Sequence, residues 1–435
     1  MVLSRLFGIR GNIIEVIDQS KIKKQAYFWN TCSGIVNAGQ SALVLIFIAH
    51  FLSKTEAGVF SIGIALGNLI SFIAKYGIRN YQVTDIEEQF NFNQFFTSRI
   101  FSTLFSIVLI SGYIIFQFFE GNYYFDKALT IFVICLWKII DAIEDVYYGM
   151  YQQKGRLDIG AKCFTWRALI STLLMCLFIA FGFSLLISSI VVFVSSILMT
   201  FLFVSISLKN FKLNKIGIDF INVKKILIVC FPLFLAETLS IYIANSPKYL
   251  IDWYLDDNAQ AIFGYLMMPA FTIMVINKFI FRPIIRDLGE LWHKSDKTYF
   301  IKRVLFQYLI VAAITIVVII GGVTLGIPIL SSFYNTDLSN YKVDFIILLL
   351  GGGMYALSSF IMVPLTAMRL QKLLAYGFVA VSIASIIFGM VLIQKAGVRG
   401  ATLLYLALNT LLALYLTICF LIGSKNNNKN NYENT

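Results

Sequence analysis

Long apolar runs separated by short polar segments are the dominant pattern of this chain. Because a helix of about 20 apolar residues crosses the hydrocarbon core of a bilayer, each run of that length is predicted to be a transmembrane helix. An even number of such helices would leave both termini on the same side of the membrane. Twelve runs have this length: 27–51, 57–79, 97–119, 128–150, 163–182, 185–208, 226–251, 259–281, 304–327, 343–366, 373–394 and 400–423.

Composition and charge agree with an all-α membrane protein. Hydrophobic residues make up 59% of the 435 residues and charged residues only 13%. With these helices, 28 of the 35 Lys and Arg residues fall on the side of the termini and five on the other side. The positive-inside rule then predicts cytoplasmic termini. The net charge of +12 is explained by loops that face anionic membrane lipids, so no nucleic-acid partner is predicted.

A sequence repeat divides the chain into two halves. LSKTEAGVF at 52–60 returns as LDDNAQAIF at 255–263, and KYGIR at 75–79 returns at the same offset as KFIFR at 278–282. We therefore expect two pseudo-symmetric six-helix lobes related by an axis along the membrane normal. The predicted domains are an interfacial segment (1–26), an N-terminal lobe (27–208), a cytoplasmic linker (209–225), a C-terminal lobe (226–423) and a disordered tail (424–435).

Three stretches of the chain resemble one transporter family. They are HFLSKTEAGVFSIGIAL (50–66), YYGMYQQKGRLDIGAK (147–162) and NSPKYLIDWYLDDNAQAIFGYLMMP (245–269). They resemble Wzx-type flippases, in the polysaccharide branch of the multidrug/oligosaccharidyl-lipid/polysaccharide (MOP) exporter superfamily. The third stretch departs from the usual pattern by carrying Ala261 where the family has glycine.

The resemblance implies a MATE-like fold, with two lobes forming a V around a central cavity. It implies a multi-pass protein of the bacterial inner membrane that moves an undecaprenyl-pyrophosphate-linked oligosaccharide to the outer leaflet. The oligosaccharide would be a repeat unit of O-antigen, capsule or a similar glycan, as in lipopolysaccharide biosynthesis. The glycan polymerase and chain-length machinery are the protein partners that this role suggests.

Two pairs of cations mark the predicted cytoplasmic mouth. Lys75 and Arg79 are four residues apart at the end of the second run, and Lys278 and Arg282 repeat them at the end of the eighth. Two cations on one helix face repel each other unless an anion lies between them. The pairs are candidate ligands for the lipid pyrophosphate, and the alternative is that they only set the topology.

Ionisable residues inside the fourth and seventh runs are candidates for substrate binding or coupling. In the fourth run, Lys138, Asp141 and Asp145 share one helix face. They would bind a coupling cation or proton in the cavity, or else form a structural pair such as Lys138 with Asp141.

The seventh run carries Glu237, Lys248 and Asp252 on one side. Lys248 would bind the pyrophosphate from the outward side, or reach the outer interface with Asp252 as its partner. Glu237 would carry a coupling proton, or hydrogen-bond a neighbouring helix.

The first run carries Asn30, Asn37 and Ser41 on one face, with Gln40 beside them. This stripe would hydrogen-bond sugar hydroxyls, and the alternative is hydrogen bonding between helices. Arg167, near the start of the fifth run, is interpreted as a topology determinant.

No catalytic or metal-binding constellation is predicted. The two histidines, His50 and His293, lack ligands at metal spacing, and no Walker A sequence occurs. Gly351–Gly353 lies in an apolar run and indicates close helix packing or a hinge. The sequence therefore predicts a transporter that works by alternating access without ATP or another cofactor. Coupling to a proton or sodium gradient, or to the membrane potential, is a hypothesis. The competing functions are a drug/cation antiporter of the same superfamily and a membrane glycan polymerase or ligase.

Overall fold

The computed structural model describes residues 19–85, 88–208, 211, 219–293, 297–368 and 370–426. Its regular structure in these ranges is helical, and Cα packing divides the chain into two compact units, 1–238 and 239–435. The predicted interfacial segment and tail lie mostly outside the described residues.

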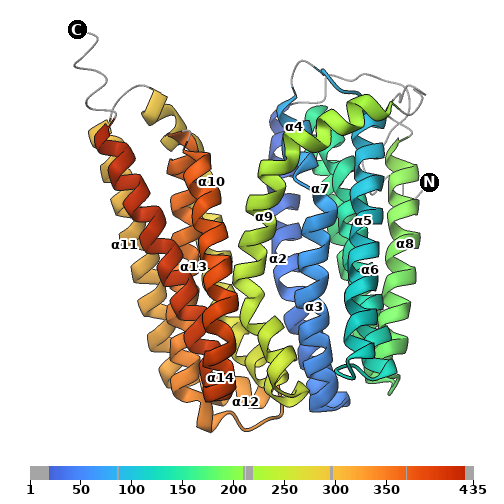
Figure 1. The fold of residues 1–435 in the computed structure, drawn as a ribbon. Coiled ribbons are helices and arrows are strands. Elements are labelled where there is room, and N and C mark those ends of the chain that lie inside the picture. Colours follow the sequence, from blue (N-terminus) through green and yellow to red (C-terminus); the bar gives the residue numbers. More distant parts are fainter. Residues whose placement is uncertain are drawn as a thin grey trace. The chain divides into compact units, whose positions relative to one another are not determined.

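The described residues of unit 1 form seven helices and the first part of an eighth, α9 (Figure 1). In this unit α6 packs against α3, α5 and α8, while α2 packs against α7. The helices are α2 (Gln19–Phe51), α3 (Lys54–Lys75), α4 (Ile78–Thr84), α5 (Phe92–Phe119), α6 (Phe125–Gln153), α7 (Leu157–Ala180), α8 (Leu185–Leu208) and α9 (Phe220–Tyr254).

Unit 2 contains the rest of α9 and the helices that follow it. In this unit α13 packs against α10, α11 and α14. The elements are α10 (Asp257–His293), α11 (Lys297–Gly321), the π-helical turn η1 (Gly322–Gly326), α12 (Ile327–Phe333), the 3₁₀ turn η2 (Ser339–Tyr341), α13 (Lys342–Ala367) and α14 (Gln371–Asn426).

Within the described ranges, ten helical segments are long and apolar enough to cross a membrane. This number is two fewer than the twelve predicted spans, because of α6 and α14. The 29-residue α6 carries too many charged side chains to be among the ten, and α14 merges two predicted spans across Gly397, whose φ of 56° and ψ of −131° are not helical. The chain is therefore a multi-pass membrane protein.

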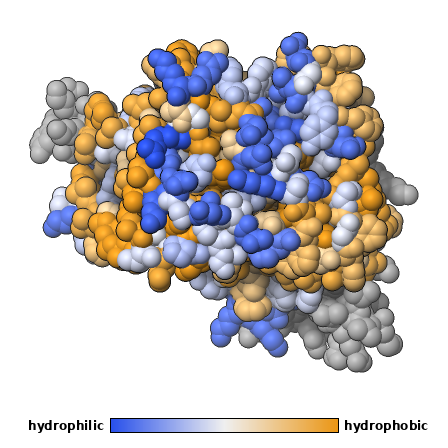
Figure 2. Space-filling model, turned by 90° about the horizontal axis from the view of Figure 1, so that it is seen from below, coloured by the Kyte–Doolittle hydropathy of each residue, from blue (hydrophilic) through white to orange (hydrophobic). Residues whose placement is uncertain are grey.

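The surface matches a bilayer environment. Large apolar side chains are exposed along α5, as with Val108 (69% exposed), and along α11, as with Leu309 (68%). Figure 2 looks at the ends of the helices and shows polar side chains gathered there, with apolar side chains around them. Apolar sides and polar ends are expected of helices that cross a bilayer.

The sequence repeat is a repeat of local structure. The side chain of Ser53 caps α3 by accepting from Glu56 N, and Asp256, at the same offset, accepts from Ala259 N at 2.8 Å at the start of α10. Ser, Thr, Asn and Asp are favoured at this position because their oxygen satisfies a free helical N–H. Each copy of the repeat thus begins a helix in the same way.

The three glycines at 351–353 serve helix packing, as the sequence predicted. A Cβ on Gly352 would lie 2.8 Å from the carbonyl oxygen of Ala270 in α10, and one on Gly353 would lie 2.5 Å from Thr315 in α11. Small residues at such crossings allow helix backbones to approach closely.

Candidate functional site

An acidic residue held by two arginines lies near the end of α3. Asp145 of α6 accepts from Arg79 of α4 at 3.3 Å and from Arg99 of α5 at 2.9 Å. Arg99 is fully buried and also donates to the carbonyl oxygen of Ala74 at 2.9 Å. The side chain of Arg79 is 31% exposed and donates to Gln152 at 3.0 Å. Arg79 is therefore the accessible arm of this cluster, and Arg99 is its fixed arm.

A break in the helix gives Arg79 this position. Tyr76 and Gly77 have φ values of 50° and 65°, in the left-handed region, so α3 ends at Lys75 and α4 starts at Ile78. A Cβ on Gly77 would lie 2.8 Å from that of Leu233 in α9, so glycine is required both by its φ and by its close packing.

The prediction that Lys75 and Arg79 share one helix face is therefore wrong. Arg79 turns to Asp145, whereas Lys75 lies 5.0 Å from the centre of the Phe72 ring. Among the residues that the structure describes, no carboxylate forms an ion pair with Lys75. In the second copy α10 continues through Lys278 and Arg282, and the side chains of these two residues lie outside the described part.

A second buried cluster joins α6 to α7. Arg167 donates to Asp141 at 2.5 Å and to Glu144 at 2.8 Å. The side chains of Arg167 and Glu144 are 1% and 3% exposed. Arg167, interpreted from the sequence as a topology determinant, neutralises two carboxylates inside the unit, and its effect on topology stays a prediction.

Lys138 belongs to a separate chain of hydrogen bonds. Its ammonium group donates to Gln40 of α2 at 3.0 Å, and Gln40 donates to Thr172 of α7 at 2.8 Å. The predicted structural pair of Lys138 with Asp141 is thus replaced by a Lys138–Gln40 bond and an Arg167–Asp141 bond. A Cβ on Gly67 of α3 would lie 2.9 Å from the Lys138 side chain, so this glycine makes room for it.

The predicted polar stripe on α2 is split by the structure. Gln40, expected beside the stripe, is its buried member. Asn30 donates to the carbonyl oxygen of Ala26 in its own helix at 2.8 Å. Asn37 is exposed and Ser41 is half-buried. Contact of these residues with sugar stays a prediction.

The predicted residues of α9 belong to different units. Glu237, in unit 1, accepts from the amide of Asn80 at 2.6 Å. Lys248 and Asp252, in unit 2, are both buried, with 3% and 8% exposure. The partnership of Lys248 with Asp252 therefore stays a prediction.

Two buried or partly buried arginine sites were not predicted from the sequence. Arg99 is not among the residues predicted from the sequence, although it lies within α5, seven residues after the first residue of that helix. In unit 2, Arg399 donates to Asp344 at 2.9 and 3.1 Å, next to Thr402 at 3.3 Å from the same carboxylate. The available signal in each case was an arginine placed within or beside an apolar run, where a charge requires a partner.

Solved transporters share this fold. The lipid II flippase MurJ in an inward closed conformation is 17% identical, with a TM-score of 0.64 over 93% of this chain and 90% of that chain. A mutant of the Vibrio cholerae MATE transporter VcmN is 10% identical, with a TM-score of 0.62 over 94% and 98%. An inward-facing multidrug resistance MATE family transporter of the MOP superfamily is 14% identical, with a TM-score of 0.61 over 92% and 94%. The TM-scores and coverages show that this chain shares its fold with these transporters.

A family assignment comes from the sequence itself. No curated protein sequence matches the chain significantly. Residues 24–286, more than half of the chain, match the model of a family described as polysaccharide biosynthesis protein. This match and the MOP-type fold confirm the predicted resemblance at the level of the family. The chain belongs to the polysaccharide biosynthesis protein family.

Proposed function

We propose that this protein is a flippase that moves an undecaprenyl-pyrophosphate-linked oligosaccharide from the inner to the outer leaflet of the bacterial inner membrane. The main support for this proposal is that a chain of the polysaccharide biosynthesis family has the fold of a transporter. In this proposal the chain crosses the membrane twelve times, with cytoplasmic termini and lobes at 27–208 and 226–423. The structure of α6 and the break at Gly397 in α14 support that count.

The cluster around Asp145 supplies a way to bind the pyrophosphate. Within the described ranges Lys75 forms no ion pair at contact distance, although Asp141 and Glu237 are close enough to act on its charge, and Arg79 is partly exposed. A phosphate group would attract the Arg79 guanidinium away from Asp145, because arginine binds phosphate through two parallel hydrogen bonds. Asp145 would keep its bond to the buried Arg99 at 2.9 Å. Arg79 can therefore exchange partners without leaving an unpaired buried carboxylate.

Lys278 and Arg282 are proposed to serve the second lobe in the same way. The oligosaccharide is proposed to pass the polar residues of the first run, of which Asn37 is exposed. Lys248, which is buried, is proposed to receive the pyrophosphate on the outward side.

Glu237 is the best-placed carboxylate for a coupling ion. Asp141, Glu144 and Asp145 are each bound to an arginine, whereas Glu237 accepts a hydrogen bond from the neutral amide of Asn80. We expect Glu237→Gln to abolish any response of transport to a pH gradient. Transport that responds normally in this variant would exclude Glu237 from coupling.

The test is translocation in proteoliposomes loaded with a fluorescent lipid-linked oligosaccharide. The fraction that becomes accessible to an external glycosidase measures transport. Lys75→Ala and Arg79→Ala are expected to slow transport at least tenfold. Lys154→Ala, at an exposed cation that pairs with Glu88, is the matched control and should transport normally.

A genetic test separates this function from drug export by the same fold. Deletion is expected to leave lipid-linked repeat units on the cytoplasmic side and to abolish the surface polysaccharide. Normal surface glycan together with new drug sensitivity would refute the flippase and favour an antiporter.

A further inference from the structure

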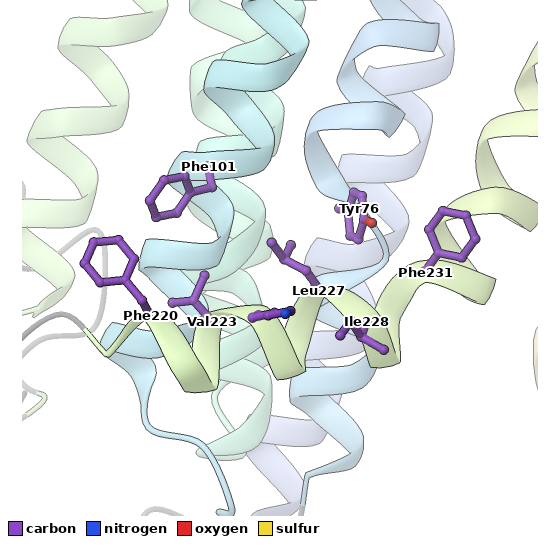
Figure 3. A pocket seen from close by; sticks show the side chains of 8 residues that line it. Tyr76, Phe101, Phe220, Val223, Leu227, Ile228 and Phe231 are labelled. Atoms are coloured by element: carbon purple, nitrogen blue, oxygen red, sulfur yellow. The ribbon is translucent and has the colours of Figure 1, made fainter.

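An apolar groove lies between the first part of α9 and the ends of α3 and α5. It has a volume of about 510 Å³. Figure 3 shows this part of α9 running across the other helices, with Val223 and Leu227 pointing toward Tyr76 and Phe101. The groove is lined by Tyr76, Phe101, Phe220, Val223, Lys224, Leu227, Ile228 and Phe231.

The first part of α9, which forms one wall of the groove, packs closely against the other helices of unit 1. Ile226 and Cys230 are fully buried in a cluster with Ile78, Phe95 and Val146. Beside this cluster, the ring of Tyr76 stacks on that of Phe234 with 4.3 Å between ring centres. The groove is thus preformed, which lowers the entropy cost of binding.

The groove is open and strongly amphipathic. Phe101, Phe220 and Ile228 line it and remain 42%, 64% and 62% exposed. Lys224 is the charged residue of the lining and is exposed, as is the adjacent Lys225. A helix with apolar side chains on one part and lysines on another is typical of the membrane interface. The matching ligand has a hydrocarbon chain and an anionic head.

Charge favours one such ligand. Tyr76 in the groove wall directly follows Lys75, which forms no ion pair at contact distance in the described ranges. Tyr76 precedes the partly exposed Arg79 by three residues. Lys224 is thus in the lining, and Lys75 and Arg79 lie within three residues of the lining residue Tyr76 along the sequence. A pyrophosphate carries more negative charge than the single phosphodiester of a phospholipid and complements this set better.

We propose that the groove binds the polyprenyl chain of the carrier lipid, with its pyrophosphate held by Lys75, Arg79 and Lys224. This inference rests on the proposed function and adds a site for the lipid part of the substrate. The polyprenyl chain stays in the apolar groove of unit 1, while the charged head group meets the cations at the end of α3. Binding energy from the polyprenyl chain would thus position the head group.

The experiment measures binding of undecaprenyl pyrophosphate to the full-length protein in nanodiscs. Inorganic pyrophosphate measures the head-group site alone. Leu227→Trp fills the groove, and Ile221→Trp adds the same bulk to the same helix at a residue that is 71% exposed and outside the groove. Phe101→Ala removes one exposed wall of the groove and provides a second test if the Leu227 variant does not fold.

We expect Leu227→Trp and Phe101→Ala to weaken binding of undecaprenyl pyrophosphate about tenfold or more. Loss of contact with about two methylene groups is enough for a change of roughly this size. Both variants should bind inorganic pyrophosphate as the unaltered protein does, and Ile221→Trp should change neither affinity.

Three results would overturn the inference. The first is equal binding of the long-chain ligand by both groove variants and the unaltered protein. The second is equally tight binding of phosphatidylglycerol, which would assign the groove to bulk phospholipid. In both cases glycan transport by the unaltered protein would leave the flippase proposal intact. The third is failure of the unaltered protein both to bind any pyrophosphate and to transport glycan, which would refute the proposed function itself.

Discussion

Replacement of Arg167 by methionine tests the central ion cluster of unit 1. The substitution keeps much of the side-chain volume but removes the guanidinium that donates to Asp141 at 2.5 Å and to Glu144 at 2.8 Å. Glu144 is 3% exposed and the Asp141 side chain 15%, so water cannot replace the lost donors fully. Breaking a buried pair in this way costs about 3–5 kcal/mol, because it leaves an uncompensated charge.

The expected magnitude is large enough to measure by thermal unfolding in detergent. For a unit of this size, 1 kcal/mol shifts Tm by about 2–4 °C, so the loss corresponds to a decrease in Tm of roughly 6–20 °C. Adding Asp141→Asn and Glu144→Gln should recover most of the decrease, because neutral amides no longer require a cation.

A matched control is available in the same unit. Arg79→Met also removes an arginine from a carboxylate, but Asp145 retains Arg99 at 2.9 Å and Arg79 is 31% exposed. The expected loss is about 1 kcal/mol or less. Equal decreases in Tm for Arg167→Met and Arg79→Met would refute the reasoning, as would a triple variant no more stable than Arg167→Met alone.

Three further predictions follow from local geometry. Gly77→Ile should lower the stability by about 1–3 kcal/mol in thermal unfolding, because its φ of 65° is unfavourable for a β-branched residue, and an unchanged Tm would contradict the break in α3. Ser53→Ala and Asp256→Ala should each cost about 1 kcal/mol by removing a helix cap, and a cost at only one position would contradict the structural repeat. Lys154 donates a hydrogen bond to Glu88 at 2.8 Å and lowers the pKa of that carboxyl, so the stabilising effect of the pair is lost as the pH falls through the lowered pKa. Lys154→Gln should raise the pKa of Glu88 measured by NMR titration, and an unchanged pKa would exclude the bond.

The membrane fold could be predicted from hydrophobic runs, because lipid-facing helices are apolar over lengths that loops do not reach. The run at 57–79 nevertheless reads as a single span. The break at Tyr76–Gly77 depends on one glycine and on its contact with Leu233, which is 156 residues away in the sequence and leaves no periodic signal.

The partners within the candidate site were harder to predict. Helical periodicity places Lys138, Asp141 and Asp145 on one face of α6, but it does not tell which neighbouring helix meets each residue. Four different helices do so: α2 contributes Gln40 to Lys138, α7 contributes Arg167 to Asp141, and α4 and α5 contribute arginines to Asp145. A single sequence holds no information on such pairs until the packing of the helices is known.

One glycine explains why the two copies of the repeat are not equivalent. KYGIR in the first copy has Gly77 where KFIFR in the second has Ile280. Glycine adopts the left-handed backbone at little cost, whereas isoleucine strongly resists it. The first copy breaks, and Arg79 turns to meet Asp145. The second copy remains helical through Lys278 and Arg282. Both copies of the repeat thus keep the two cations, while a single backbone change in the first copy built the accessible arginine that we propose exchanges between protein and substrate.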